Sequence, residues 1–185
     1  MLAPDRPTLL VFGGSRGAQG LNAALPRALK NLPDVQVLHL AGKGKAEAAA
    51  AAYRAGGISA DVREYLEDMT SAYGAADLVV CRSGASTLAE LAAQRAPAVL
   101  VPYPHATADH QDVNARVFER AGAAARLRED ELDGKLGAVL TDLLKSSGAE
   151  KRRTAMSSAY AKLGLPPAAE TVEGFVAALE RLSTR

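Results

Sequence analysis

The clearest structural signal in the chain is the segment Leu78-Val79-Val80-Cys81-Arg82-Ser83-Gly84-Ala85-Ser86-Thr87-Leu88-Ala89-Glu90-Leu91. It begins as a short apolar run rich in valine and passes through a small polar turn at residues 82–86. Apolar residues then return at helical spacing, so the pattern is typical of a strand, a loop and a helix. We therefore expect a βα unit here, which is the building block of α/β folds.

The turn of this βα unit predicts an anion site. Ser83–Ser86 would present unpaired backbone N–H groups and two hydroxyls at a helix start, where the helix dipole favours negative charge. Glu90, one turn further on, suits a sugar diol better than a phosphate, so the pair of features indicates a nucleotide. The alternative is that Thr87 and Glu90 form a T-x-x-E capping box and only start the helix.

Size and composition narrow the class of ligand. The 185 residues fit one domain, and the formal net charge of +1, without a basic stripe, argues against nucleic acid or membrane as a partner of this chain. Aromatic residues make up only 4% of the chain, so stacking platforms for single-stranded nucleic acid are not expected. A small-molecule site fits these properties better.

Cysteine and histidine usage argues against a metal site. Cys81 is the only cysteine, so no intrachain disulfide can form and a reducing compartment is expected. His105 and His110 lie on a candidate site loop, but they have no cysteine partner and no H-E-x-x-H helix.

No run approaches the ~18 apolar residues of a transmembrane helix. Because a core strand follows Met1 closely, we expect the chain to be a later part of a longer protein.

Strands and helices alternate along most of the chain. Expected strands cover residues 8–12, 35–40, 61–65, 78–81, 98–101 and 123–127, and expected helices include 43–55, 69–73, 87–94 and 111–121. This alternation predicts a doubly wound, Rossmann-like parallel sheet, with ligands beyond the carboxyl ends of its strands. We expect a single domain, 1–185, with an α/β core at 1–128 and a helical tail at 129–185.

A second glycine-rich turn, Gly13-Gly14-Ser15-Arg16-Gly17, follows the first strand and has three interpretations. It is a phosphate loop, a G-x-S-x-G nucleophile elbow of a serine hydrolase that uses Ser15, or a tight turn. The elbow requires an earlier strand and loop to supply its second oxyanion donor. The order of elements therefore disfavours the hydrolase.

These turns, in this order, resemble the membrane-associated N-acetylglucosaminyltransferases of peptidoglycan synthesis. The matching pieces are Gly13-Gly14-Ser15-Arg16-Gly17-Ala18 with Leu21-Asn22, Tyr65-Leu66-Glu67-Asp68-Met69, Ala76-Asp77-Leu78-Val79-Val80-Cys81-Arg82-Ser83-Gly84-Ala85 with Thr87 and Glu90, and His105 with Asp109-His110-Gln111 and Asn114-Ala115. They cover about residues 8–127. The resemblance implies the carboxyl-terminal half of a GT-B glycosyltransferase, which holds the donor UDP-N-acetylglucosamine.

The resemblance also implies a role for each matching position. Ser15 and the turn 85–87 would hold the diphosphate, Leu66 would meet the uracil, Glu90 would accept from the ribose hydroxyls, and His110 and Gln111 would lie against the N-acetylglucosamine. The full set of donor-binding residues predicted in this way is Gly14, Ser15, Arg16, Leu66, Ser83, Gly84, Ala85, Ser86, Thr87, Glu90, His110 and Gln111.

Several expectations concern the rest of such an enzyme. No tightly bound cofactor and no metal are implied, and the lipid-linked acceptor would bind an amino-terminal domain that this chain lacks. That domain would also make the membrane contact, with the whole protein cytoplasmic and peripheral at the inner face of the membrane. No catalytic base is identified in this chain. The alternative is a donor-binding subunit of a split glycosyltransferase that needs a partner chain.

Overall fold

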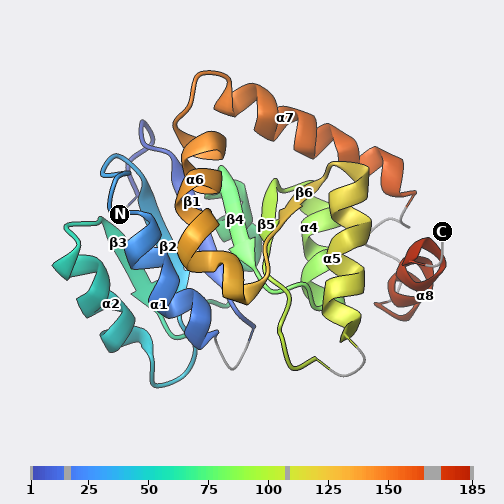
Figure 1. Cartoon of the computed structure of the whole chain (residues 1–185), viewed down its shortest axis with the longest axis horizontal. Coiled ribbons are helices and arrows are strands. Elements are labelled where there is room, and N and C mark those ends of the chain that lie inside the picture. Colours follow the sequence, from blue (N-terminus) through green and yellow to red (C-terminus); the bar gives the residue numbers. More distant parts are fainter. Residues whose placement is uncertain (1, 15–17, 107–108, 165–171, 184–185) are drawn as a thin grey trace.

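A computed structural model describes residues 2–14, 18–106, 109–164 and 172–183 of the chain (Figure 1). The strands are β1 (Thr8–Phe12), β2 (Gln36–Leu40), β3 (Ala60–Arg63), β4 (Leu78–Cys81), β5 (Ala98–Leu100) and β6 (Ala124–Arg126). The α-helices are α1 (Gln19–Ala28), α2 (Ala46–Ala55), α3 (Met69–Ala75), α4 (Ala85–Gln94), α5 (His110–Ala121), α6 (Leu132–Leu144), α7 (Ala149–Ala159) and α8 (Val172–Ser183). Two 3₁₀ turns are η2 (Glu129–Glu131) and η3 (Tyr160–Leu163).

The strands form one sheet in the order β3-β2-β1-β4-β5-β6, and every neighbouring pair is parallel. The chain adds strands outward from β1 on one side and then outward from β4 on the other. Helices follow the strands in sequence and cover both faces of the sheet, so the predicted doubly wound α/β fold is confirmed (Figure 1). In such sheets the order reverses at a switch point, here between β1 and β4, where ligands bind at the strand carboxyl ends.

The four inner strands, β2, β1, β4 and β5, bury both of their faces because helices cover the two sides of the sheet, whereas the edge strands β3 and β6 are only partly buried. Leu9 and Val11 of β1 belong to one apolar cluster, which includes the buried faces of α1 and α6. Leu10 and Phe12 belong to the other cluster, which includes residues of α4, α5 and α8. This explains the continuous apolar runs that predicted the strands, because alternation is lost when both faces are buried.

The helical tail contributes to both clusters. Leu136 and Leu140 of α6 are fully buried against the first cluster, while Leu163 and Phe175 pack in the second. Between them α7 runs along one edge of the molecule (Figure 1), where the Arg153 guanidinium lies 3.3 Å from a carboxylate oxygen of Asp77. Within the described ranges, none of the helices combines the length and the apolar character that crossing a bilayer requires.

Several element boundaries differ from the sequence-based expectation, and the largest shifts of a helix start are those of α4 and α2. Helix α4 begins at Ala85 rather than Thr87, with Gly84 in extended conformation as its cap. Helix α2 begins at Ala46 rather than Lys43, because residues 42–45 form a turn. A hydrogen bond from Lys45 N–H to Gly42 O, at 3.1 Å, closes this turn. The first difference lies at the predicted anion site and changes the role of Thr87.

A buried polar network joins α1, α2 and β2. The His39 ring nitrogens lie 2.9 Å from the Tyr53 hydroxyl and 3.0 Å from Asn22 Oδ1, and Asn22 Nδ2 donates to Ala41 O at 3.0 Å. His39 is only 1% exposed, and this burial lowers its pKa to about 4. The ring is therefore neutral in the folded protein at pH 7, with both nitrogens in hydrogen-bond contact.

This histidine should make stability depend on pH. Because the folded-state pKa lies below the ~6.5 of an unfolded chain, the unfolded state binds the extra proton between these values, and stability falls as pH decreases. We expect a slope of up to ~1.4 kcal/mol per pH unit between pH 6.5 and 5, measured by urea unfolding. His39→Gln should lose this component, whereas His105→Gln, at an exposed position, should keep it. The same slope in wild type and His39→Gln would contradict this assignment.

Candidate functional site

Polar turns follow β1, β4 and β5 at the same edge of the sheet. They are residues 13–18, 82–84 and 101–109, of which residues 15–17 and 107–108 lie outside the described part of the chain. Since all six strands are parallel, their carboxyl ends share one edge, and the first two turns flank the β1–β4 switch point. The candidate site is therefore the edge at which the sequence predicted it.

Within the described part of the chain, the amino end of α4 carries backbone donors without a partner. None of the described side chains caps the helix, and its first intrahelical bond runs from Leu88 N–H to Gly84 O at 3.0 Å. The first turn of a helix leaves its N–H groups without intrahelical acceptors, so those of Ala85, Ser86 and Thr87 remain available. Ser86 is exposed and the other two residues are half-buried. Free N–H groups and the helix dipole make this turn suitable for a phosphate.

Glu90 lies one turn into α4 and is held by a tyrosine. Its Oε2 accepts a 2.9 Å hydrogen bond from the Tyr73 hydroxyl of α3, and the residue is exposed. The capping-box alternative is wrong, because the helix begins at Ala85 and Thr87 is its third residue rather than its cap. The carboxylate is thus positioned by a tertiary contact and not by the end of its own helix.

Leu66 lies beyond β3 and packs at the same edge. It is half-buried against the apolar cluster that contains Phe12, Leu40 and Tyr73. The neighbouring Tyr65 is 70% exposed. Tyr73 of α3 belongs to the apolar cluster against which Leu66 packs, and its hydroxyl contacts the Glu90 carboxylate. Leu66 therefore offers a small apolar surface on the same side of the sheet edge as Glu90.

Ser83 and Gln111 tie the β4 and β5 turns together. The Ser83 hydroxyl is fully buried and donates to Gln111 O at 2.8 Å, while Asn114 Nδ2 donates to Ser83 O at 3.4 Å. Gln111 Oε1 accepts from Tyr103 N–H at 3.0 Å. The Ser83 hydroxyl is thus used inside the fold, and the Gln111 side-chain N–H₂ group remains as the donor with which this residue could meet a ligand.

Four further predicted residues are Gly14, His110, Ser15 and Arg16, of which the structure describes the first two. Gly14 is exposed and has φ of +82°, a conformation that favours glycine, with open space where a Cβ would lie. His110 is exposed at the first position of α5. Ser15 and Arg16 lie outside the described residues, so their predicted roles in diphosphate binding or, for Ser15, in hydrolysis are not placed.

An ion pair that sequence inspection did not reveal supports the turn after β4. The Arg82 guanidinium pairs with the Glu129 carboxylate, and its Nη1 donates to Val101 O at 3.3 Å and Pro102 O at 3.0 Å. The Arg82 side chain is only 8% exposed. The Glu129 carboxylate packs directly against Gly20 of α1, where any side chain larger than hydrogen would collide with it. The pair connects β4, β5, η2 and α1 around the site.

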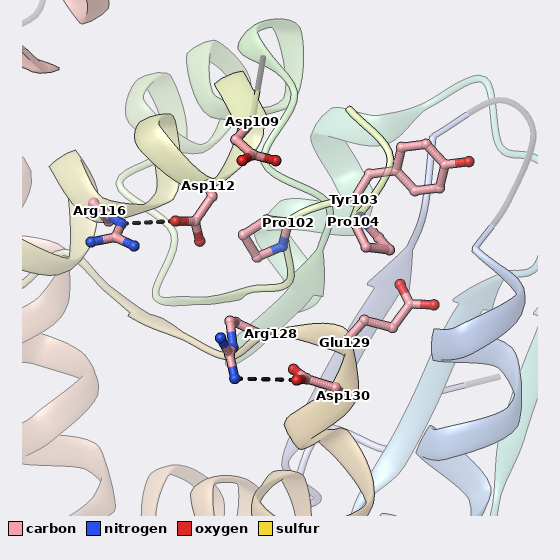
Figure 2. A pocket seen from close by; sticks show the side chains of 9 residues that line it. All are labelled: Pro102, Tyr103, Pro104, Asp109, Asp112, Arg116, Arg128, Glu129 and Asp130. Carbon is pink, nitrogen blue, oxygen red and sulfur yellow. Dashed lines mark hydrogen bonds and ion pairs between the residues drawn. The ribbon is translucent and has the colours of Figure 1, made fainter. Parts of the chain in front are cut away.

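A cavity of about 480 Å³ lies beside this pair, between the loop after β5, the start of α5 and η2 (Figure 2). Figure 2 shows Arg116 directed at Asp112 on one side and Arg128 at Asp130 on the other, with 2.8 and 3.1 Å between the paired atoms. Carboxylates outnumber guanidinium groups among its lining residues. The cavity therefore disfavours a diphosphate and is distinct from the free N–H groups of α4.

No group of three or more histidine, cysteine or acidic side chains suited to a metal ion occurs in the described part of the chain. Cys81 is fully buried at the end of β4, and burial raises the pKa of its thiol. The thiol is therefore protonated and inaccessible, which makes it a packing residue.

Comparisons with known proteins agree with this geometry. The model of the glycosyltransferase family 28 C-terminal domain matches residues 8–172. The UDP-N-acetylglucosamine--N-acetylmuramyl-(pentapeptide) pyrophosphoryl-undecaprenol N-acetylglucosamine transferases of Anaeromyxobacter sp. (strain Fw109-5) and Myxococcus xanthus are both 44% identical, over 95% and 91% of this chain. Those matches cover 47% and 45% of the relatives, so the chain spans about half of their length.

The solved structures give the same result. MurG of Acinetobacter baumannii superposes with a TM-score of 0.79 and 30% sequence identity, over 100% of this chain and 54% of that one. The family match covers most of the sequence, and the six-stranded parallel sheet agrees with the carboxyl-terminal half of a GT-B enzyme. On these grounds the chain belongs to the family of glycosyltransferase family 28 C-terminal domains.

Proposed function

We propose that this chain is the donor-binding half of an inverting glycosyltransferase that moves N-acetylglucosamine from UDP to a lipid-diphosphate-linked muramoyl-pentapeptide in peptidoglycan synthesis. The observation that carries the proposal is the uncapped amino end of α4, with free N–H groups at residues 85–87 and the Glu90 carboxylate one turn further on. An anion site followed by a diol acceptor matches the order of groups in a nucleoside diphosphate.

Each part of the donor has a corresponding group at this edge. The diphosphate would lie at the amino end of α4 and at the loop of Gly14, and the ribose hydroxyls would donate to Glu90. The uracil would lie against Leu66, and the hexose would meet His110 and the Gln111 side-chain amide at the start of α5. Ser83 would contribute through its buried hydrogen bond, which holds the α4 and α5 turns together.

The proposed chemistry is a direct displacement at the anomeric carbon, in which an acceptor hydroxyl attacks and UDP leaves. Helix-end N–H groups would stabilise the negative charge that develops on the departing diphosphate. The donor is a substrate, and no tightly bound cofactor is proposed. The base that removes the acceptor proton and the site for the lipid-linked acceptor would lie in the part of the relatives that this chain does not span, together with the contact to the inner membrane surface.

A second possibility is that the chain is the donor-binding subunit of a split glycosyltransferase. The observation that favours it is the coverage, because the chain spans about half of its relatives. The two possibilities predict the same donor site and differ in where the acceptor half is encoded. The gene sequence that flanks this one distinguishes them.

Calorimetric titration with UDP, UDP-N-acetylglucosamine, UDP-glucose and GDP tests the proposal. We expect the chain to bind both UDP and UDP-N-acetylglucosamine, more weakly than a complete enzyme because half of the cleft is missing, and to leave them unhydrolysed. GDP should bind less well, since the proposed base subsite is assigned to uracil, which is smaller than a purine. The absence of both heat and a rise in melting temperature with millimolar UDP would refute the donor-site assignment.

A further inference from the structure

Tyr73 is buried in α3 and its hydroxyl reaches the candidate ribose carboxylate on a different helix. The residue is 5% exposed, and its ring meets Phe12 of β1 edge to face with 6.0 Å between ring centroids. Its hydroxyl donates to Glu90 Oε2 at 2.9 Å. A buried ring held by an aromatic neighbour gives this hydroxyl a fixed place, while the carboxylate it contacts is exposed.

We propose that Tyr73 is a positioning residue for nucleotide recognition, which orients Glu90 so that its carboxylate accepts from the ribose hydroxyls of the donor. The inference rests on the proposed function, because it assumes that Glu90 meets the ribose. It adds that recognition of the ribose depends on a side chain that does not itself touch the nucleotide.

The geometry favours this role for three reasons. First, a glutamate side chain has three rotatable bonds, so an exposed Glu90 without a partner would sample many rotamers and lose entropy on binding. Second, the Tyr73 bond occupies one carboxylate oxygen, and no described residue donates to the other, which leaves Oε1 for a ligand. Third, a bond from a phenol to a carboxylate is charge-assisted and therefore holds well.

The protonation state of Tyr73 is suited to this task. Burial, together with the nearby Cys81 thiol and the Glu90 carboxylate, raises the pKa of the Tyr73 phenol above its usual range. The hydroxyl therefore keeps its proton at physiological pH and remains a donor. Because the carboxylate cannot donate when ionised, the direction of the bond is fixed, and both lone pairs of Oε1 stay available to accept.

The position of Tyr73 also links two parts of the site. Helix α3 follows the β3 loop that carries Leu66, and Tyr73 and Leu66 pack in the same apolar cluster. Through its hydroxyl, the same residue reaches Glu90 on α4. Tyr73 therefore fixes the carboxylate relative to the surface on which the base would lie, which sets the distance between the base and ribose subsites.

The test uses Tyr73→Phe, with Tyr160→Phe as the matched control. Tyr160 is also buried, at 6% exposure, it also packs edge to face on a phenylalanine, and its hydroxyl donates to Ala96 O at 2.6 Å, away from Glu90. Both variants lose one buried hydroxyl and its bond, so their melting temperatures should fall by similar amounts. Calorimetric affinities for UDP and 2′-deoxy-UDP then separate positioning from stability.

We expect Tyr73→Phe to weaken UDP about fivefold and to reduce the preference of the chain for UDP over 2′-deoxy-UDP by a similar factor, within the range of one ordinary hydrogen bond. Tyr160→Phe should leave both quantities unchanged. In a Glu90→Ala background, Tyr73→Phe should have no further effect on UDP, because the residue acts through that carboxylate.

The outcomes distinguish this inference from the proposed function. If wild type binds UDP and Glu90→Ala weakens it, but Tyr73→Phe behaves as Tyr160→Phe does, the positioning role is wrong and the donor site stands. An equal loss from Tyr73→Phe in the wild-type and Glu90→Ala backgrounds would also overturn the inference. If wild type fails to bind UDP, the proposed function itself fails.

Discussion

Glu90→Ala should reduce the affinity for UDP roughly 10- to 100-fold, the largest effect expected of any single change at the site. The carboxylate would accept from the ribose hydroxyls, and a hydrogen bond to a charged group contributes about 1.5–3 kcal/mol. Glu90→Gln should lie between wild type and Glu90→Ala, because an amide oxygen still accepts, from Tyr73 or from the ribose, but without the charge. Titration calorimetry on the three proteins measures the series.

The stability of the same variants provides the control for this prediction. Glu90 is exposed and lies within α4 rather than at its end, so its loss removes no cap, and only the Tyr73 hydroxyl loses a partner. We expect small changes in melting temperature alongside the large change in affinity. Variants that melt earlier and yet bind UDP as wild type does would remove Glu90 from the donor site.

Arg82→Met should destabilise the fold by about 3–5 kcal/mol, the largest expected effect on stability. The substitution leaves the Glu129 carboxylate without its charge partner and takes a donor from Val101 O and Pro102 O. Breaking a buried pair on one side costs this much because the remaining charge is uncompensated. At about 2–4 °C per kcal/mol for a chain of this size, the melting temperature should fall by on the order of 10 °C, measured by calorimetry.

Two further variants make this prediction specific. Arg54→Met removes a guanidinium from an exposed pair with Glu47, at 2.7 Å and 64% and 86% side-chain exposure, and should change the melting temperature little. Combining Arg82→Met with Glu129→Met should recover part of the lost stability, because neither charge is then left alone. Equal decreases in melting temperature for Arg82→Met and Arg54→Met would show that the buried Arg82–Glu129 pair stabilises the fold no more than the exposed pair does.

The fold could be predicted from the sequence because its strongest signals are local. The apolar runs at residues 8–12 and 78–81 are buried on both faces of a parallel sheet, and such strands have no polar alternation to obscure them. The sequence predicts the start of α4 two residues late, at Thr87, because its apolar residues return at helical spacing only from there. The cap is instead Gly84, whose extended backbone carries no side-chain signature.

The candidate site could be predicted only as far as its local motifs extend. The turn at residues 82–86 and Glu90 could be predicted as a nucleotide site because strand, turn and helix are contiguous in the chain. The contacts that hold the site were not predictable from the sequence. Tyr73 meets Glu90 and Arg82 meets Glu129 only after the sheet order brings their elements together, and separations of 17 and 47 residues leave no periodic signal.

The role of the Gln111 side chain could be predicted from the sequence only in part. The family resemblance implies a contact between this side chain and the hexose. In the fold its Oε1 also accepts from Tyr103 N–H, which depends on how the loop after β5 folds back onto the helix. A contact that supports a loop in this way leaves no signal in the local sequence pattern.

The most direct test of the central claim is a crystal structure of the chain with UDP. We predict that diphosphate oxygens accept hydrogen bonds from the N–H groups of residues 85–87 and that the ribose hydroxyls donate to Glu90, with Tyr73 still bound to the same carboxylate. UDP in the cavity lined by Asp112, Arg116 and Arg128, with the amino end of α4 left free, would contradict the account.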